Sequence, residues 1–307
     1  MENIVFFGAG SIGSLFAAKL AARFPKYSVS LVGRKDDVDV IKKNGLRVSG
    51  KSDIYVKIPV FESVEQVKSK ISLLFLCVKN FQTQEAVCQL KDHLSKDCVI
   101  VSLQNGLSHL EVLKKNFEGF EIVVGVTSHG AQRMQPGLVN HTGIGFTIIG
   151  NLRNASEERL LQICTLFSES GIMTSSDVDI VSVLWKKAII NSSINPITAF
   201  LEVENGKLAA NPILKSFVSA VCAESSAIAC ARGFDIDVDS ALDKTFEVIA
   251  QTKKNKSSML QCVLAKKKTE IESINGVFVS VGSELGIDTH LNSLLLHLIK
   301  EKTKEFY

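Results

Sequence analysis

The chain has 307 residues, of which 46% are hydrophobic and 22% charged, and its formal net charge is +3. These proportions are ordinary for a folded globular protein, and so small a charge gives no reason to expect a nucleic acid or an acidic membrane as partner. Because a domain usually holds about 100 to 150 residues, the length predicts two domains, each with its own core.

The cysteines and histidines give no sign of a metal site. The seven cysteines are an odd number, and neither they nor the six histidines show the spacing of metal ligands. A reduced, intracellular protein fits this usage best. The apolar run over residues 71–78 is far shorter than the roughly 20 residues that span a bilayer, and the N-terminus lacks a basic leader region. The sequence therefore predicts a cytoplasmic protein without a metal.

The first expected element is a buried strand over residues 3–7, which leads directly into the glycine-rich segment Gly8–Gly13 and then a helical pattern. A G-x-G-x-x-G segment between strand and helix is typical of dinucleotide-binding domains. Gly8 would permit the tight turn, Gly10 would let the backbone approach a pyrophosphate, and Gly13 would let helix pack on strand. Free N–H groups at the helix N-terminus would bind the phosphates. The alternative is a turn that binds no ligand.

The end of the second expected strand, residues 28–32, bears on the choice between NAD and NADP. NAD-binding domains tend to place an acid there for the ribose 2′-hydroxyl. Here Arg34 comes first, and a guanidinium matches a 2′-phosphate with two parallel hydrogen bonds, so the sequence favours NADP. Asp36 and Asp37 follow and keep NAD open as an alternative, and Arg34 could also be an ordinary exposed charge.

Two more buried strands are expected over residues 71–78 and 99–103, with a helix over 83–94 between them. This alternation predicts a doubly wound parallel sheet, in which ligands bind outside the carboxyl ends of the strands. Lys79 and Asn105 follow these strands, and Arg34 follows the strand over 28–32, so we expect all three at one edge with the glycine segment. Lys79 or Asn105 could instead be a plain turn residue.

Further elements are expected in the first half of the chain. They are a helix over 36–44, short strands or an irregular crossover at 46–48 and 54–60, strands over 121–126, 138–141 and 146–149, and a helix over 156–170. The last three strands, separated by Gly and Pro turns, are expected to close the sheet in antiparallel fashion. His129 and His141 lie among them, and local hydrogen bonds are the commoner arrangement for such histidines than contact with a substrate.

The pattern changes near residue 177. Long segments of helical periodicity follow, over 213–232, 240–251, 271–285 and from 289 onward. The predicted fold class is therefore α/β, a Rossmann-type doubly wound sheet with a second, all-helical C-terminal domain. We expect residues 1–177 to form the NADP-binding domain and residues 178–307 the helical substrate and catalytic domain.

A polar stripe opens this helical domain. In the stretch 184–200, Lys187, Asn191 and Asn195 fall four residues apart among apolar neighbours. Burying an ammonium and two amides costs free energy unless something hydrogen-bonds them, and Pro196 is expected to push Asn195 out of helical geometry. A polar ligand where the two domains meet would satisfy these groups. The alternative is a lysine that reaches solvent and asparagines that cap neighbouring turns.

Two further segments complete a recognisable set. They are Asn-Gly-Lys-Leu at 205–208, and residues 256–276 with Lys-Ser-Ser-Met-Leu-Gln and Lys-Thr-Glu-Ile-Glu-Ser-Ile-Asn-Gly. Together with the Asn-Pro-Ile-Thr-Ala run, the Gln-Asn-Gly turn and the glycine segment, they make the chain resemble the ketopantoate reductases (2-dehydropantoate 2-reductases) along almost its whole length. The resemblance implies NADPH-dependent reduction of 2-dehydropantoate to (R)-pantoate in pantothenate biosynthesis. It also implies a small 2-keto acid as substrate, and a monomer or homodimer.

The resemblance implies a role for each matching position. Lys187 is the catalytic lysine and general acid, with Glu270 as its acidic companion. The positions implied to bind substrate are Asn105, Asn191, Asn195, Asn205 and Ser258. Those implied to bind NADPH or NADP+ are Gly8, Ala9, Gly10, Ser11, Ile12, Gly13, Arg34, Lys79, Asn105 and Glu270.

Other functions stay open at this point. One is a related reductase of another 2-keto acid, and another is a two-domain dehydrogenase of a 3-hydroxy acid or a sugar phosphate. A third is a non-catalytic NADP-sensing module, which would have no need of a proton donor such as Lys187.

Overall fold

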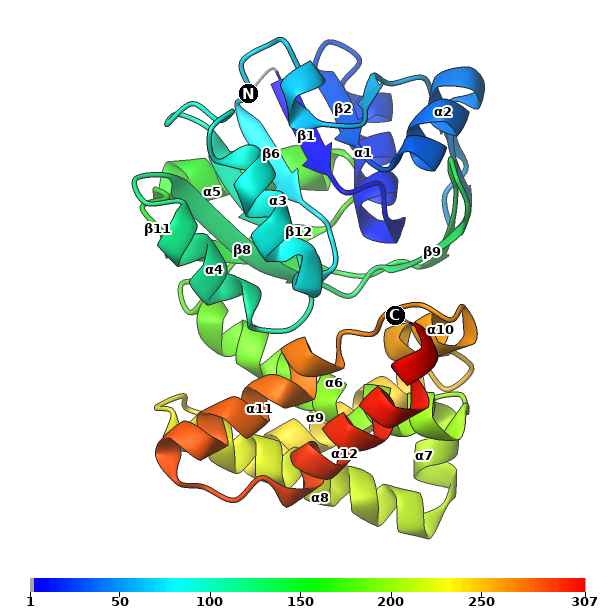
Figure 1. Ribbon diagram of the computed structural model, residues 1–307, viewed down its shortest axis with the longest axis vertical. Coiled ribbons are helices and arrows are strands. Elements are labelled where there is room, and N and C mark those ends of the chain that lie inside the picture. Colours follow the sequence, from blue (N-terminus) through cyan, green and yellow to red (C-terminus); the bar gives the residue numbers. More distant parts are fainter. Residues whose placement is uncertain (1–2, 307) are drawn as a thin grey trace. The chain divides into compact units, whose positions relative to one another are not determined.

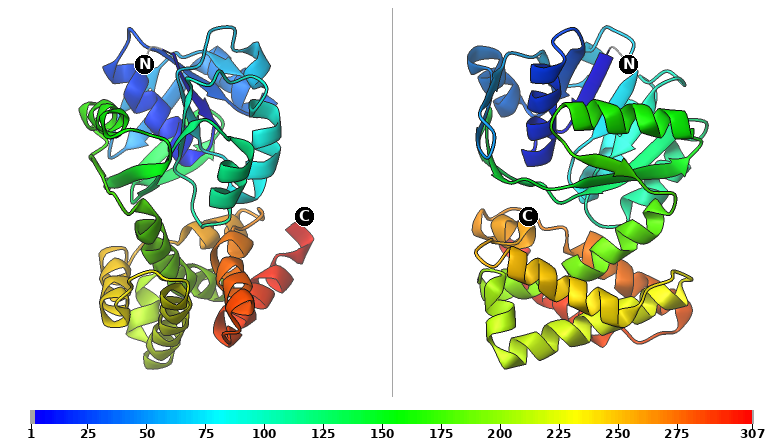
Figure 2. Two further views of the ribbon diagram at one scale, coloured as in Figure 1. Left: turned by 90° about the vertical axis from the view of Figure 1, so that its left-hand side faces the viewer. Right: turned by 180° about the vertical axis from the view of Figure 1, so that it is seen from behind.

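The computed structural model describes residues 3–306 and divides into two compact units (Figures 1 and 2). The first unit comprises Met1–Gln104 and His109–Ile180, and the second comprises Asn105–Ser108 and Val181–Tyr307. The four residues 105–108 therefore group with the second unit, although the segments before and after them belong to the first.

An eight-stranded sheet forms the centre of the first unit, in the order β12-β11-β8-β7-β6-β1-β2-β5. Its strands are β1 (Asn3–Phe7), β2 (Ser28–Val32), β5 (Val60–Phe61), β6 (Leu73–Leu76), β7 (Val99–Ser102), β8 (Glu121–Thr127), β11 (Thr147–Arg153) and β12 (Thr174–Ser176). The strands from β5 to β8 in this order run parallel, whereas β11 is antiparallel to β8. The predicted doubly wound sheet is thus confirmed. The strand at 121–126 was expected to be among the antiparallel ones, which is wrong, because β8 runs parallel to β7.

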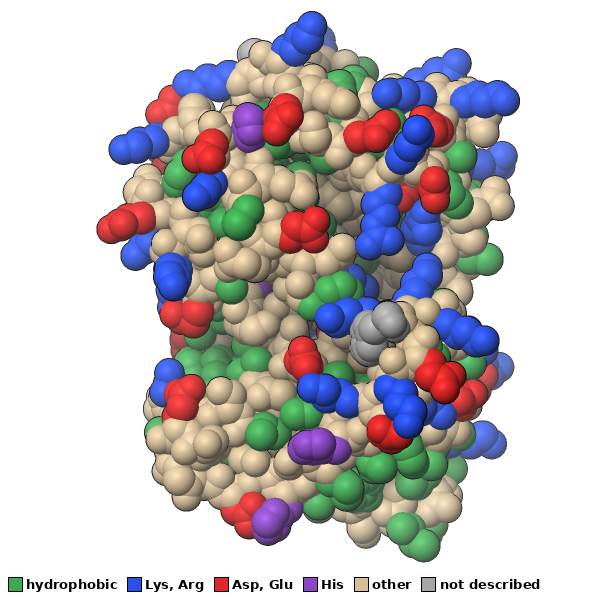
Figure 3. All heavy atoms as spheres, viewed as in Figure 1, with side chains coloured by type: hydrophobic (Ala, Val, Ile, Leu, Met, Phe, Trp, Pro, Cys, Tyr) green, Lys and Arg blue, Asp and Glu red, His purple; other side chains and the backbone are tan. Residues whose placement is uncertain are grey.

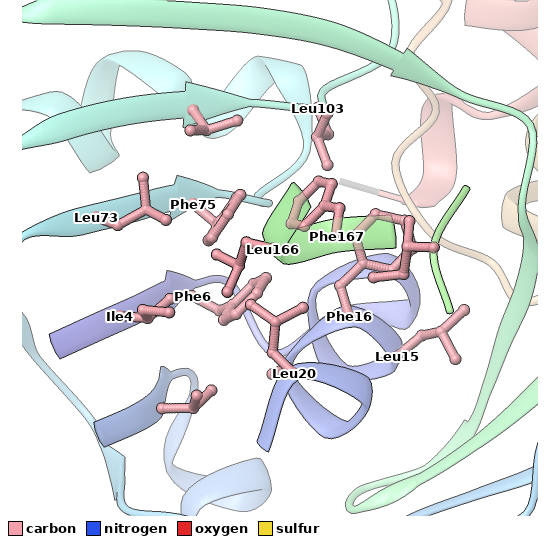
Figure 4. Close-up of a cluster of buried hydrophobic side chains, with 14 of the residues drawn as sticks. Ile4, Phe6, Leu15, Phe16, Leu20, Leu73, Phe75, Leu103, Leu166 and Phe167 are labelled. Atoms are coloured by element: carbon pink, nitrogen blue, oxygen red, sulfur yellow. The ribbon is translucent and has the colours of Figure 1, made fainter. Parts of the chain in front are cut away.

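Five helices accompany this sheet: α1 (Ser11–Arg23), α2 (Lys35–Asn44), α3 (Thr83–Leu90), α4 (His109–Asn116) and α5 (Glu157–Glu169). α1 and α5 cover one face, and α3 and α4 the other (Figures 1 and 2). A cluster of aromatic rings packs within the first of these layers (Figure 4). The ring of Phe75 stacks on those of Phe6 and Phe167 with centroid distances of 4.4 and 5.1 Å, and Phe16 meets Phe167 edge to face at 5.4 Å. This packing holds β1 and α1, and hence the glycine segment between them, in place.

A second sheet corrects one prediction. It has the order β4-β3-β10-β9, from β3 (Leu46–Gly50), β4 (Ile54–Val56), β9 (Gly130–Gln135) and β10 (Leu138–Gly143). The expectation that residues 138–141 close the main sheet is wrong, because β10 pairs with β9 and β3 instead. A Pro136-Gly137 turn, with φ of +72° at Gly137, folds β10 back on β9. The buried Val139 then shares the core under α1 with Leu46 of β3.

The second unit is all-helical, as predicted. Its helices are α6 (Ile180–Leu201), α7 (Gly206–Ala210), α8 (Pro212–Ala231), α9 (Val238–Gln251), α10 (Ser258–Leu264), α11 (Ile271–Leu285) and α12 (His290–Lys302). Of the described residues, only those of α8 form a helix long and apolar enough to cross a bilayer. Val218 and Val221 of α8 are fully buried with Ile194 of α6 in the unit's core, as expected of a core helix in a globular domain.

α6 continues through Pro196, so the prediction that Asn195 leaves helical geometry is wrong. A proline inside a helix has no N–H to donate to the carbonyl four residues earlier, here that of Ser192. Asn275 of α11 replaces this donor: its Nδ2 donates to Ser192 O at 3.2 Å and to Asn292 Oδ1 at 2.9 Å. The helix therefore continues because a neighbouring helix satisfies the carbonyl that the proline leaves open.

Asn275→Leu is expected to lower the free energy of unfolding of the second unit by about 1–3 kcal/mol, because buried acceptors lose their donor. Trp185 is the chain's single tryptophan, so its fluorescence during urea unfolding reports on this unit. Pro196→Ala restores a backbone N–H that can reach Ser192 O. In a protein that already carries Pro196→Ala, Asn275→Leu should therefore lower the free energy of unfolding by less. An equal loss of this free energy with and without Pro196→Ala would contradict this account.

Candidate active site

The three glycines of the segment at the end of β1 have different surroundings. Gly8 has φ of +118°, and its N–H donates to Val32 O at 2.8 Å. A Cβ on Gly13 would lie only 2.3 Å from Gly8 O and 2.9 Å from the Cβ of Cys77. A Cβ on Gly10 would meet nothing closer than Cys77 O at 3.8 Å. Two glycines thus allow the turn and the close packing, whereas Gly10 keeps an open backbone surface.

The N-terminus of α1 leaves its first amides without a side-chain cap. Gly10 occupies the N-cap position, so no side chain caps the first amides of α1, and the first turn carries no acidic residue. Ala9 is buried, and Ser11 and Ile12 are half-buried. Uncapped amides and a positive helix end suit an anion, so these residues fit the pyrophosphate of a dinucleotide.

Two cationic residues lie at the same edge of the sheet as the glycine segment. β1 pairs in register with β2 and β6, so that Phe7 lies beside both Val32 and Leu76 at the carboxyl ends. Arg34 follows β2, is exposed and precedes the first turn of α2. Lys79 follows β6 and is half-buried. The expectation that both share an edge with the glycine segment therefore agrees with the pairing of the strands.

In the second unit, two other residues of the predicted active site act on Lys187 of α6. Its Nζ donates to Asn105 Oδ1 at 2.9 Å. Burial lowers the pKa of Lys187 to about 8, and the charge of Glu270 opposes this shift. Lys187 thus bonds an amide instead of extending into solvent, and it carries a proton that it can give up close to neutral pH.

The N-terminal turn of α11 positions both of these partners. Glu270 occupies the N-cap position and is 7% exposed, so its carboxylate lies at the positive end of the helix. The N–H of Leu107 donates to Ser273 O at 3.1 Å. Gly106 has φ of +81°, and a Cβ there would lie 2.4 Å from Ser273 O. The Gln-Asn-Gly turn therefore needs its glycine to bring Asn105 against α11.

The asparagines on the α6 stripe have unused side-chain amides. Asn195 is 6% exposed and Asn191 is half-buried. Within residues 3–306, no hydrogen bond joins either side-chain amide to another residue. At a rise of 1.5 Å per residue, the stripe from Lys187 to Asn195 is about 12 Å long. Neither amide is among the fully buried side-chain atoms that lack a partner, so both face space that water or a bound polar molecule can occupy.

Ser258 follows a serine that contacts the C-terminal half of α6. The Thr198 hydroxyl, three residues after Asn195, donates to Ser257 Oγ at 2.8 Å. Ser257 also caps α10 by accepting from the N–H of Leu260 at 3.1 Å. Ser257 is thus the structural serine of the pair, and the exposed Ser258 keeps its hydroxyl for other contacts.

Asn205 is only partly satisfied by the protein. Its Nδ2 donates to Thr252 Oγ1 at 2.9 Å, while its buried Oδ1 has no hydrogen-bond partner among the described residues. Its backbone N–H donates to the carbonyl oxygen of Asn255 at 3.0 Å. The exposed Asn255 thus lies beside Asn205, a contact that no pattern in the sequence indicates.

The two histidines singled out from the sequence, His129 and His141, have local partners. His141 Nδ1 lies 2.8 Å from Ser52 Oγ, and His141 Nε2 lies 3.3 Å from His129 Nδ1. Burial lowers the pKa of His129 to about 4, so this ring is neutral at physiological pH. Across residues 3–306, no three His, Cys, Asp or Glu side chains form a group that could hold a metal ion.

Comparison with known proteins gives consistent matches over the whole chain. The family model described as Ketopantoate reductase PanE/ApbA matches residues 4–154, and the model of its C-terminal part matches residues 179–303. The 2-dehydropantoate 2-reductase of Pyrococcus abyssi is 35% identical over 300 residues, which cover 98% of this chain and 97% of that protein.

Solved structures agree with this match. A probable 2-dehydropantoate 2-reductase from Bacillus subtilis has a TM-score of 0.83 and 30% identity, covering 98% of this chain and 99% of that one. D-mandelate dehydrogenase with NADH and anilino(oxo)acetate has a TM-score of 0.93 and 24% identity over 99% of each chain. This second likeness shows the fold alone.

Proposed function

We propose, since this chain belongs to the ketopantoate reductase family, that it reduces 2-dehydropantoate to (R)-pantoate with NADPH. The observation that carries the proposal is the environment of Lys187, which is bonded to Asn105 and has a pKa lowered to about 8 beside Glu270. A reductase of a keto acid needs such a proton donor, whereas an NADP sensor does not.

The chemistry assigned to this site is a proton transfer. When bound, NADPH supplies the hydride that attacks the ketone carbon. The ammonium of Lys187 would hydrogen-bond the ketone oxygen, stabilise the negative charge that develops there and donate its proton. Glu270 keeps the ammonium charged in its buried environment, and Asn105 fixes the direction of the Nζ atom.

The remaining polar groups of the second unit would orient the substrate. The unused amides of Asn191 and Asn195 can donate to its hydroxyl or carboxylate oxygens, and the Ser258 hydroxyl can bind the carboxylate end. The buried Oδ1 of Asn205, which lacks a partner among the described residues, would accept from a substrate hydroxyl if binding exposes it. A small hydroxylated keto acid can lie along a stripe about 12 Å long. Holding the substrate in one orientation would contribute part of the rate enhancement.

On the first unit, the residues from Gly8 to Gly13 and the uncapped end of α1 would hold the pyrophosphate of NADPH. Arg34 and Lys79 supply positive charge at the same edge, and a guanidinium is suited to a 2′-phosphate. A neutral ribose hydroxyl has no comparable attraction for these cations, so we expect NADPH to be preferred over NADH.

One assay separates the candidate functions. NADPH oxidation is followed with 2-dehydropantoate, 2-oxoisovalerate and phenylglyoxylate as competing 2-keto acids. The proposal expects the highest kcat/KM with 2-dehydropantoate, and phenylglyoxylate as the best substrate would contradict it. A sensing module would show no substrate-dependent oxidation with any of them.

The pH dependence of the reaction should follow the pKa of Lys187. Reduction needs the protonated ammonium, so kcat/KM should fall about tenfold per pH unit above a midpoint near pH 8. Oxidation of pantoate needs the neutral amine, so kcat/KM for the oxidation should increase with pH through the same pH range. Because Glu270 raises this pKa, Glu270→Gln should move the midpoint to lower pH, and an unchanged midpoint would contradict the pairing.

We further propose that the protein acts in the cytoplasm, as a monomer or a homodimer. All seven cysteines are free thiols, which suits a reducing compartment. Light scattering of the purified protein distinguishes the two oligomeric states.

A further inference from the structure

An ion pair in the first unit involves an acid that the sequence left available for NAD. Asp37 of α2 is 7% exposed, and its Oδ1 accepts from Nη2 and Nε of Arg133 at 2.6 and 3.1 Å. Arg133 lies on β9, and its backbone N–H donates to Ser11 Oγ at 3.0 Å. No pattern in the sequence marks this arginine, which is 96 positions from its partner.

This pair lies next to the glycine segment. A Cβ on Gly33, at the end of β2, would lie 2.7 Å from the Cβ of Ala9 and 3.6 Å from the Cβ of Asp37. The guanidinium of Arg133 therefore lies beside the carboxyl end of β2, where dinucleotide-binding domains place the adenosine ribose. Figure 3 shows many Lys and Arg side chains, with acidic ones among them, over the side of the first unit that carries α2.

The pair changes what Asp37 can bind. A free carboxylate here would accept hydrogen bonds from a ribose 2′-hydroxyl and repel a 2′-phosphate. Arg133 occupies Oδ1 and offsets the negative charge. A guanidinium has five N–H donors, and Asp37 uses two of them, so donors remain for a phosphate. Asp37 in turn holds the planar group in one orientation, which favours bidentate binding of an anion.

We propose that Arg133 is a determinant of cofactor preference: it withdraws Asp37 from the ribose and acts with Arg34 as a second guanidinium for the 2′-phosphate. The inference rests on the proposed use of NADPH. It assigns a role in specificity to a strand of the small sheet, outside the βαβ unit that carries the glycine segment.

Binding measurements on the purified protein test the proposal without turnover. Dissociation constants for NADPH and NADH are measured by nicotinamide fluorescence, and those for 2′,5′-ADP and 5′-AMP by calorimetry. Arg133→Met removes the guanidinium but leaves Asp37 buried and unpaired, so Asp37→Asn/Arg133→Met is the second variant. Arg47→Met is the matched control, because Arg47 lies on β3 of the same sheet with a 65% exposed side chain.

Loss of hydrogen bonds to a charged group should weaken binding of NADPH and 2′,5′-ADP about 10- to 100-fold in both Arg133 variants. In the double variant, binding of NADH and 5′-AMP should change less than about twofold, and Arg47→Met should match the wild type. Asp37→Asn alone keeps the guanidinium of Arg133 and should therefore keep the preference for NADPH over NADH.

Two results would overturn the role of Arg133: equal weakening of NADPH and NADH, or no change in either affinity in a folded double variant. The wild-type measurement separates this from the proposed function. If the unmodified protein bound NADH as tightly as NADPH, the proposed cofactor itself would be wrong, and the inference would fail with it.

Discussion

Lys187→Met is expected to lower kcat for reduction of 2-dehydropantoate by about 100- to 10,000-fold, the range for loss of a general acid. The methionine keeps much of the side-chain volume but removes the ammonium that faces the developing negative charge. Lys187 is not among the positions implied to bind the cofactor, so the dissociation constant for NADPH should change far less than kcat. Single-turnover absorbance at the nicotinamide band measures the chemical step directly.

Lys186→Met is the matched control for this variant, since Lys186 is the preceding residue on α6 and is exposed. It should retain wild-type turnover. Lys187→Met leaves the carboxylate of Glu270 buried without its cation, which could destabilise the fold. The double variant Lys187→Met/Glu270→Gln removes this unpaired charge, so a loss of turnover in it is not caused by misfolding. Full turnover in a folded Lys187 variant would rule out the assigned acid role.

Gly13→Ala and Gly10→Ala are expected to damage the protein in different ways. A Cβ on Gly13 would lie 2.3 Å from a backbone oxygen, so α1 must move away from β1. Such overpacking should destabilise the first unit by about 1–3 kcal/mol or more. A Cβ on Gly10 has room in the protein, so only the poorer N-cap preference of alanine lowers stability, by less than about 1 kcal/mol. It would instead obstruct the pyrophosphate and weaken NADPH binding about 10- to 100-fold, equivalent to one lost charge-assisted hydrogen bond.

Scanning calorimetry and NADPH titration together test this contrast. The thermal transition of Gly10→Ala should lie close to that of the wild type, while that of Gly13→Ala should fall by several degrees more. Gly171→Ala is no suitable control, because its φ of +73° is itself strained in an alanine. Gly276 of α11 is better: its nearest neighbour to an added Cβ lies at 3.6 Å. Equal affinity for NADPH in Gly10→Ala and Gly276→Ala would contradict the pyrophosphate role of Gly10.

Elements with strong local signals were predicted closely. β1 and β2 have the predicted bounds, and α11 spans the predicted 271–285, ending at Gly286 in the left-handed conformation with φ of +69°. In each case the signal is contained in a few neighbouring residues: a continuous apolar run, a helical period, or a glycine that can adopt positive φ.

Elements stabilised by distant partners were missed. The sequence of β9, Gly-Ala-Gln-Arg-Met-Gln, has no apolar alternation, and only its pairing with β10 makes it a strand. The short helices α7 and α10 were also missed, because so few residues show no clear period. Asn205 and Gly206 lie beside Lys253 and Asn255 through backbone hydrogen bonds that no local pattern encodes.

The sequence by itself determined the two-part architecture, the glycine segment and the stripe of Lys187, Asn191 and Asn195, since each depends on residues close together in the chain. Only the tertiary structure decided the pKa of the lysine in this stripe and whether its helix continues past the proline. The pKa of Lys187 depends on its burial and on Glu270, and α6 passes Pro196 because Asn275 supplies the missing donor. Such effects arise between residues brought together by folding, where removal from water and a single well-placed partner decide the energy of a polar group.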